Sequence, residues 1–208
     1  METKIKRIKQ VCLYSGILLL MLSASYLIYD HCIKEREIKE EKQLIEEFKN
    51  TEIEVIETPE NMETEDEPSP EQIYYSMVIE IPSIKLEKGL CSMGQTCNRV
   101  SRNIEVLKES DMPNITNGNL FLAGHNGNSS VSYFNKLDRM NIGDSIYIYY
   151  DGFKYEYKLD NYYEINKTGE ANIKRDKNRT TLVLVTCKKN SKDKQMIYVA
   201  YLENKNAY

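Results

Sequence analysis

The chain has 208 residues, a net charge of −4 and 29% charged residues. This length suits one ordinary domain with appendages, and the acidic balance provides no basic stripe of the kind that DNA- and RNA-binding proteins need, so the sequence excludes nucleic acid as a partner. Two histidines are too few for a histidine-built metal site, and none of the five cysteines forms a CxxC pair, which excludes zinc ribbons and thioredoxin-type motifs.

The first expected elements are a basic segment, residues 1–10, and an apolar helix, residues 11–29, which contains no charged side chain. A helix of this length would measure about 28 Å, close to the hydrocarbon thickness of a bilayer. Basic residues before it and acidic residues after it favour a cytoplasmic N-terminus and an exported remainder. A cleaved signal peptide is the alternative, because Ser23 and Ser25 are small enough for a peptidase site.

Residues 30–73 are expected to form a charged extracellular stalk and linker. Glu and Lys dominate up to about residue 50, which is typical of a continuing, solvated helix. Residues 51–72 are rich in acid and proline with few large apolar side chains, so we expect a flexible acidic spacer there.

The folded domain is expected over residues 74–208. Its candidate strands share alternating or continuous runs of β-branched and aromatic side chains. They are residues 76–82, 118–124, 144–150, 153–159, 162–166, 180–186 and 195–202. Asp151 and Gly152 between two alternating runs predict a hairpin, and only residues 103–110 and 130–140 look like short helices. Many short strands with few helices predict an all-β fold, a closed or nearly closed β-barrel.

Two reactive side chains come directly after buried apolar runs. Cys187 ends "TTLVLVTC", and His125 ends "LFLAGH". A cysteine at such a position is often only a small hydrophobe, and a loop histidine is usually a surface residue. If the two strands are neighbours in one sheet, however, both side chains lie at the same rim. An imidazolium favours the nucleophilic thiolate and can later protonate a departing amine, so the pair predicts acyl transfer.

These motifs, in this order behind an N-terminal anchor, resemble the sortases, the cysteine transpeptidases of Gram-positive bacterial surfaces. The resemblance covers about residues 78–202, including "VIEIPSIKLEKGL" at the domain start. It implies a sortase-like closed β-barrel with one or two short helices, preceded by a transmembrane helix. The domain start, and the absence of a long helix inserted before the last strand, favour a class D-like or class A-like member over class B.

The resemblance also implies a mechanism and partners. Cys187 would attack the Thr–Gly carbonyl of an LPXTG-like sorting signal on a surface protein, and an amine of a peptidoglycan precursor or a pilin would resolve the thioester. His125 would act as general acid and base. Leu184 and Val185 would pack beneath the site, and Thr186 would help to position the carbonyl or its oxyanion. No cofactor and no metal is expected, since the scattered aspartates match no EF-hand loop.

The family's third functional residue is an arginine on the strand after the cysteine, where it binds the substrate and stabilises the oxyanion. Alignment of "QMIYVAYL" with that strand places Gln195 at the position, with Lys194 beside it, so this sequence departs from the family. Gln195 can donate a neutral hydrogen bond, and Lys194 can supply charge without the fork of a guanidinium. A purely structural role for the position is also open. Arg175 and Arg179 are expected at the opposite end of the catalytic strand.

Three further questions stay open at this level. Without the arginine, the chain could be a sortase-fold peptide-binding protein that lost turnover. It could also be a cysteine hydrolase that uses the same two residues with water as the acceptor. Finally, Cys91 and Cys97 either form a disulfide that closes a small loop or remain two reduced thiols.

Overall fold

The computed structural model describes residues 2–50, 74–169 and 171–208. The predicted flexible spacer, residues 51–72, lies outside the described residues. The chain divides into two compact units, Met1–Leu44 and Ile45–Tyr208. The division into cytoplasmic, membrane, stalk and catalytic segments that the sequence suggests stays a prediction.

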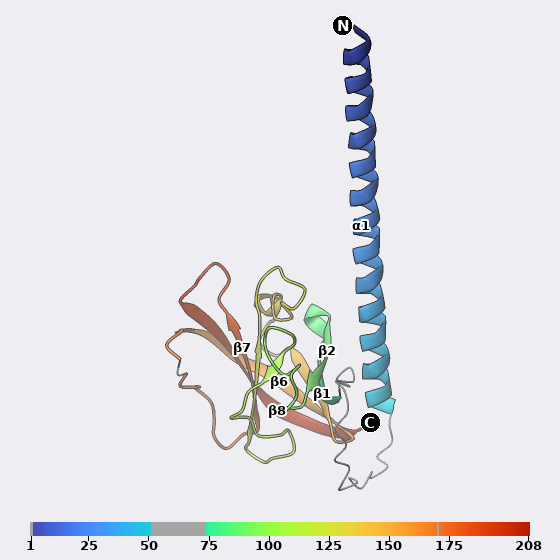
Figure 1. Cartoon of the computed structure of the whole chain (residues 1–208). Coiled ribbons are helices and arrows are strands. Elements are labelled where there is room, and N and C mark those ends of the chain that lie inside the picture. The colour runs from blue at the N-terminus through green and yellow to red at the C-terminus, as the bar shows by residue number, and fades with distance from the viewer. Residues whose placement is uncertain (1, 51–73, 170) are drawn as a thin grey trace, which may run out of the picture. The chain divides into compact units, whose positions relative to one another are not determined.

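Helix α1 runs without a break from Glu2 to Asn50 (Figure 1). Within the part Leu13–Asn50 one stretch is long and apolar enough to cross a membrane, and no side chain of that stretch is buried in the protein. The helix is therefore a candidate membrane anchor. It continues through the charged residues 30–50, as their composition predicts.

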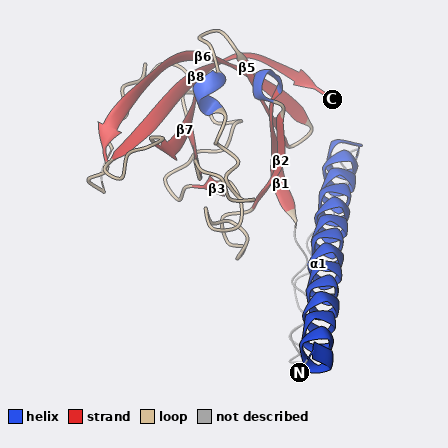
Figure 2. Cartoon of the chain, turned by 90° about the horizontal axis from the view of Figure 1, so that it is seen from above, coloured by secondary structure: helices blue, strands red, loops and turns tan. Residues whose placement is uncertain are grey.

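The second unit contains eight strands in one sheet, which wraps around a common interior (Figure 2). The strands are β1 (Tyr75–Ile81), β2 (Leu86–Cys91), β3 (Glu105–Val106), β4 (Asn119–Gly124), β5 (Ser145–Tyr150), β6 (Phe153–Asn166), β7 (Thr181–Cys187) and β8 (Lys194–Ala207). Their order is β2-β1-β5-β6-β8-β7-β4-β3, and the pair β4–β7, next to the edge strand β3, is parallel. The sheet is a nearly closed barrel, so the all-β expectation is confirmed.

The predicted hairpin and strands are present, but two of the predicted strands form a single strand. Asp151 and Gly152 both have positive φ angles, 51° and 71°, and connect β5 to β6, as a tight hairpin turn between twisted strands requires. The two runs predicted as separate strands, 153–159 and 162–166, form the single strand β6, which changes register between Leu159 and Asn161. The irregularity explains why the alternation is interrupted in the sequence.

The prediction of two short helices was wrong: one segment contains a strand, and the other contains only a single 3₁₀ turn. Residues 103–110 contain the short strand β3, because Ile104 and Val106 are both buried and alternate with polar neighbours. Residues 130–140 contain only the single 3₁₀ turn η2, Leu137–Arg139. The other short helix, η1 (Pro82–Ile84), follows β1 and begins with a proline, which suits the first turn of a helix.

Strand β7 is buried on both sides, which accounts for its unbroken apolar sequence. Leu182 and Leu184 belong to the main core inside the barrel. Val183, on the other face, packs in a second cluster with neighbours on β8. The chain between β6 and β7 packs against one part of that outer cluster: Ile173 contacts it, and the hydroxyl of Tyr201 accepts a hydrogen bond from the backbone N–H of Asp176.

The seam between the edge strands β2 and β3 is closed by side chains. Cys91, at the end of β2, forms a disulfide with Cys97, which settles the alternative that the sequence left open. Asn103 donates a hydrogen bond from Nδ2 to the carbonyl of Gly89 on β2 at 2.9 Å. Asn98 bonds both backbone groups of a β3 residue, accepting from its N–H at 2.8 Å and donating to its carbonyl at 3.0 Å.

Candidate active site

The parallel pairing of β4 with β7 brings the two predicted reactive residues to one rim. Gly124 is the register partner of Thr186, so His125 and Cys187 are the next residues at neighbouring strand ends. Paired strands lie about 4.8 Å apart, so the two strand ends that carry these residues lie side by side. Both side chains are half-buried.

Two hydrogen bonds fasten this rim. Thr186 is 3% exposed and donates from Oγ1 to the carbonyl of Gly124 at 2.7 Å, across the β4–β7 pair. Asn126 donates from Nδ2 to the carbonyl of Cys187 at 2.9 Å. The residues before and after His125 are thus each tied to the segment that carries Cys187, although the pairs are about 60 positions apart in sequence.

Gly124 has a steric reason to be glycine. A Cβ atom at this position would lie 2.6 Å from a ring carbon of Phe134, which is fully buried. Phe134 also donates its backbone N–H to the carbonyl of His125 at 3.1 Å. The absence of a side chain at Gly124 therefore lets Phe134 pack beneath the histidine and hold its backbone.

The residues proposed in place of the arginine have different surroundings. Gln195 is the register partner of Cys187 in the antiparallel pair β7–β8, and directly opposed side chains point to the same face of a sheet. Lys194 instead binds Glu164, which also binds Lys188. The two ammonium groups lower the pKa of Glu164 to about 2. The structure thus brings Gln195 next to Cys187 and pairs Lys194 with a carboxylate on β6.

Arg175 and Arg179 lie away from this rim. Arg175 approaches the hydroxyl of Thr181, the first residue of β7, at 3.4 Å. Arg179 binds Glu203 at 2.7 Å. Both are at the start of β7, opposite to Cys187, as the sequence predicts.

An open hollow of about 650 Å³ borders Cys187. Its lining comes from the chain after β4 and from the β7–β8 turn, and most of it is basic or amide. The residues are Asn126, Gly127, Asn128, Asn135, Lys136, Arg139, Cys187, Lys188, Lys189, Asn190, Ser191 and Lys192. We call this the cationic hollow.

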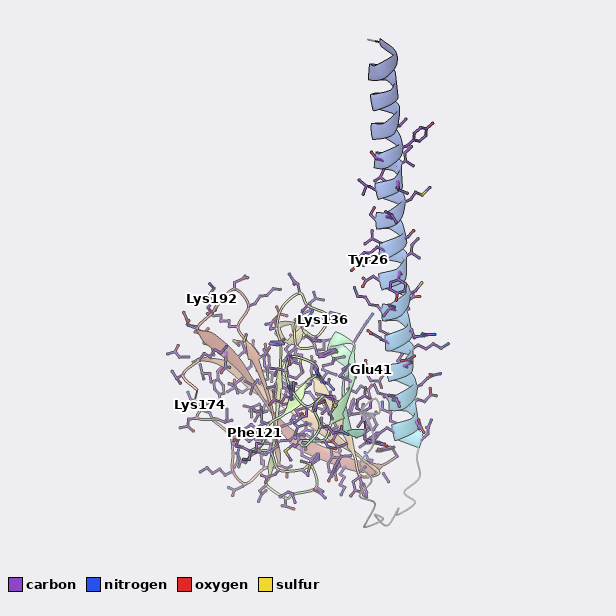
Figure 3. All side chains as sticks on the ribbon, in the orientation of Figure 1. Tyr26, Glu41, Phe121, Lys136, Lys174 and Lys192 are labelled. Atoms are coloured by element: carbon purple, nitrogen blue, oxygen red, sulfur yellow. A yellow bond between two sulfur atoms is a disulfide. The ribbon has the colours of Figure 1, made fainter. Side chains whose placement is uncertain are left out.

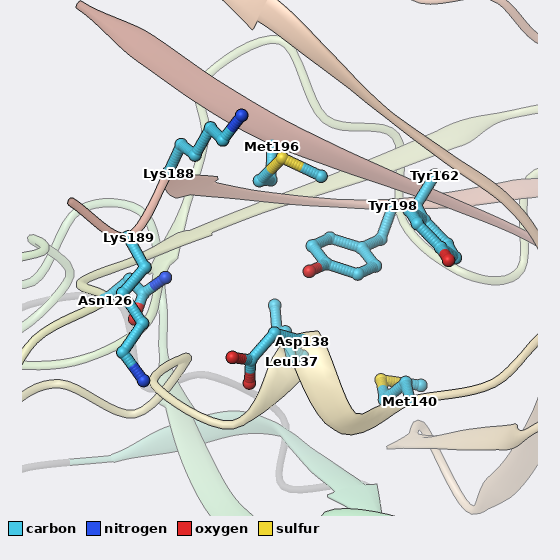
Figure 4. A pocket seen from close by; sticks show the side chains of 9 residues that line it. All are labelled: Asn126, Leu137, Asp138, Met140, Tyr162, Lys188, Lys189, Met196 and Tyr198. Atoms are coloured by element: carbon cyan, nitrogen blue, oxygen red, sulfur yellow. The ribbon is translucent and has the colours of Figure 1, made fainter. Parts of the chain in front are cut away.

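A second hollow of about 220 Å³ is more apolar and shares Asn126, Lys188 and Lys189 with the first (Figure 4). Tyr198 projects into it above the short helix η2, which carries Asp138. Burial, with a smaller contribution from the Asp138 charge, raises the pKa of Tyr198 to about 12. The phenol therefore remains neutral at physiological pH and can donate a hydrogen bond to a bound group.

Sequence reasoning missed two residues at this rim. Asn126 follows the histidine directly, and an amide at the end of a buried strand was a usable signal, because such a side chain bonds to nearby backbone. Arg139 lies in a segment that was interpreted as an amphipathic helix. Its convergence with Cys187 depends on the path of the chain after β4, which no local pattern reveals.

The described residues contain no group of three or more His, Cys, Asp or Glu side chains that could hold a metal ion. Among the cysteines whose side chains are described, Cys32 and Cys187 are free. Cys187 therefore presents a free thiol at the cationic hollow.

The sequence and the fold are both similar to those of known proteins. A family model described as the sortase domain matches residues 79–203. Among solved structures, sortase A of Listeria monocytogenes is 22% identical with a TM-score of 0.55, and the match covers 64% of this chain and 90% of that one. A lid mutant of sortase A from Corynebacterium diphtheriae is 20% identical with a TM-score of 0.57, covering 66% and 74%.

A sortase D5 transpeptidase of Clostridium perfringens is 23% identical with a TM-score of 0.52, and the match covers 64% of this chain and 84% of that one. At these identities the likeness concerns the fold. No curated protein matches the sequence. Because the family model spans more than half of the chain, the chain belongs to the sortase family of cysteine transpeptidases.

Proposed function

We propose that this protein is a membrane-anchored sortase that cleaves an LPXTG-like sorting signal between Thr and Gly and transfers the protein to a cell-wall or pilin amine. The observation that carries the proposal is the β4–β7 register, which puts His125 and Cys187 at the same rim. A thiol and an imidazole so placed can carry out both halves of an acyl transfer.

In the first half, the thiolate of Cys187 attacks the threonine carbonyl. A C–S bond forms, the Thr–Gly C–N bond breaks, and His125 gives its proton to the departing amine. In the second half, the acceptor amine attacks the thioester and His125 takes its proton. A new C–N bond forms, the C–S bond breaks, and Cys187 leaves as thiolate, ready for another cycle.

Gln195 is the best stand-in for the family arginine. It lies opposite Cys187 on β8, on the same face of the sheet, where its amide can donate to the oxyanion. A neutral donor is weaker than a guanidinium, so this enzyme is expected to be slow. Thr186 acts indirectly, because its hydroxyl is already bonded to the Gly124 carbonyl and thereby fixes the rim. Lys194, which binds Glu164, would add positive charge near the site.

The donor peptide would lie along the outer face of the sheet. This face presents half-buried apolar side chains from three strands: Ile165 on β6 is the register partner of Gln195, Val185 on β7 lies two residues before Cys187, and Phe121 on β4 is the register partner of Val183. These side chains suit the leucine and proline of an LPXTG-like signal. The membrane part of the proposal rests on α1, with its N-terminus in the cytoplasm and the barrel outside.

The full chain in uncharged detergent, incubated with LPXTG-like peptides with and without an amine acceptor, provides the test. Intact mass spectrometry should show an acyl adduct that transfers to the amine. Cys187→Ala should abolish the adduct, whereas Cys32→Ala, which removes the exposed free cysteine on α1, should retain it. An adduct that survives in Cys187→Ala contradicts the proposal.

The loss of the arginine favours one other function, a peptide-binding protein without turnover. If the protein only binds peptides, Cys187→Ala and the wild type should bind the peptides equally, and neither should form an adduct. A cysteine hydrolase, in contrast, would form the adduct and release the acid at the same rate with or without amine. The class D-like or class A-like assignment stays a prediction.

A further inference from the structure

The cationic hollow beside Cys187 combines two segments that are far apart in sequence. Lys136 and Arg139 come from the chain after β4, and Lys189 and Lys192 come from the β7–β8 turn. In the view of Figure 3, Lys136 and Lys192 lie higher in the domain than Phe121 and Lys174. Within the described part of the chain, no acidic side chain lines this hollow.

Most of these charges are unpaired, although one carboxylate, Asp138, lines the adjoining hollow together with Lys188 and Lys189. Lys188 is bound to Glu164, but Lys136, Arg139, Lys189 and Lys192 have no ion-pair partner among the described residues. Four cations held around one open space repel each other, and a concave surface of one charge sign concentrates the potential inside it. A bound anion would relieve this repulsion.

This potential constrains which acceptor can reach the thioester on Cys187. An amine acceptor is mostly an ammonium ion at neutral pH, because an amino group has a pKa of about 8 at a chain terminus and about 10 on a lysine side chain. A simple ammonium would be repelled from a hollow lined by cations. An amine that also carries negative groups would be attracted, and the same potential would favour the uncharged, nucleophilic form of its amine.

We propose that the cationic hollow binds a carboxylate or phosphate group of the acyl acceptor, so that this sortase selects acceptors that carry anionic groups near the reacting amine. The inference rests on the proposed function, because it names the acceptor class of the same site. The apolar side chains on the outer face of the sheet serve the donor, and the cationic hollow that borders Cys187 serves the acceptor.

The first experiment compares acceptors of different charge on the full chain in uncharged detergent. The probes are triglycine peptides with amidated C-termini that end in two glutamates, two glutamines or one phosphoserine. The acceptor kcat/KM should be about tenfold higher for the glutamate and phosphoserine probes than for the glutamine probe, and about 0.5 M salt should remove most of the difference. The ratio of the two anionic probes tells whether carboxylate or phosphate is preferred. Equal values for all three probes overturn the inference.

A matched pair of variants localises the effect. Arg139→Gln/Lys189→Gln/Lys192→Gln should reduce the preference for the anionic probes to about twofold or less, from about tenfold. The control Arg99→Gln/Lys108→Gln/Lys177→Gln removes the same charges from exposed positions outside the hollow and should keep the preference.

Two further outcomes bear on the inference. A loss in the acylation rate as large as the loss in the acceptor step would mean that the hollow serves the donor, and would overturn the inference. If no thioester forms at all, the proposed function fails separately. Binding of fluorescent probes to Cys187→Ala then decides the inference alone, since tighter binding of the glutamate probe that depends on the hollow supports it and equal binding overturns it.

Discussion

The barrel is held together in two different ways at its active rim and at its seam. At the rim, strands β8, β7 and β4 are joined by continuous backbone ladders, and Cys187 and Gln195 are register partners. At the seam, the edge strands β2 and β3 are held through the segment between them, which is joined to β2 by the disulfide and by Asn103 and to β3 by Asn98. A backbone ladder sets the position of every residue along it, whereas side-chain links fix only the atoms they join.

The difference indicates where geometry matters for function. A shift of one residue in the β4–β7 register would turn the side chains to the other face and separate His125 from Cys187. The seam carries none of the proposed catalytic groups, so it needs to hold the barrel closed and little more. Changes at the rim should therefore affect activity beyond their effect on stability, and changes at the seam should affect stability alone.

The largest effect is expected from Gly124→Ala at the rim. The new methyl group would overlap the buried ring of Phe134, and overpacking of this kind costs up to about 3 kcal/mol of unfolding free energy. It should also displace His125, so acylation should fall even in the folded fraction. The control is Gly94→Ala in the seam loop, where an added Cβ meets nothing within 4 Å. Equal denaturation midpoints for the two variants would contradict the expected overlap between a methyl group at position 124 and the ring of Phe134.

Removal of the seam disulfide should have the next largest effect. The Cys91→Ala/Cys97→Ser variant opens a short loop and should lose about 2 kcal/mol of unfolding free energy, measured by urea denaturation. Its kcat per folded molecule should equal that of the wild type, because the seam does not position His125 or Cys187. A drop in kcat at a temperature where the variant is fully folded would break the distinction between seam and rim.

A smaller effect is expected from the threonines at the two ends of β7. Both are buried, and each donates a hydrogen bond to a carbonyl, Thr186 to Gly124 at 2.7 Å and Thr181 to Arg179 at 2.8 Å. Thr186→Val and Thr181→Val should each cost about 1 kcal/mol of stability. Only Thr186→Val should also slow acylation. The same loss of acylation in both variants would mean that the hydroxyl of Thr186 has no special role at the rim.

The smallest effect concerns Glu164 and pH. Its two lysine partners lower its pKa in the folded protein to about 2, below the reference value of 4.5. The stabilisation is therefore fully present above about pH 4.5 and is lost as the pH falls through about 2. The melting temperature of the wild type should exceed that of Glu164→Gln at pH 6 by a small margin that vanishes near pH 2. The control Glu109→Gln removes another exposed carboxylate and should show no such trend, and titration of Glu164 near pH 4.5 by NMR would contradict the expectation.

The sequence predicts much of the rim because its signals are local. Strand β7 is recognisable from its β-branched run, and the Asp151–Gly152 turn from the residues that tolerate positive φ. Gln195 was placed at the family's arginine position by alignment of "QMIYVAYL" with the strand after the cysteine, and in the structure it is the register partner of Cys187. The pairing of β4 with β7 was only a condition in that reasoning, because their partners are 62 positions apart and strand order leaves no local trace.

The seam and the cationic hollow were harder to predict. Strand β2 contains Glu87, Lys88 and Gly89, which interrupt the sequence pattern of a strand. Its pairing with β1 stabilises the strand despite this low β-propensity. Two alternating apolar residues, Ile104 and Val106, are too few for the sequence pattern to distinguish a strand from a helix. Arg139 reaches the hollow through a loop, so its role depends on tertiary structure that the pattern of the sequence does not contain.

The seam also has a consequence for self-association. Unpaired edge strands are templates on which a second chain can add a strand, and this is a common route to aggregation. Here one edge, β3, is only two residues long, and the other, β2, has the Gly89 carbonyl occupied by the Asn103 amide beside the Cys91–Cys97 link. The same contacts that close the barrel therefore leave little free edge for a neighbouring molecule, so reduction of the disulfide should lower solubility at high protein concentration before it lowers activity.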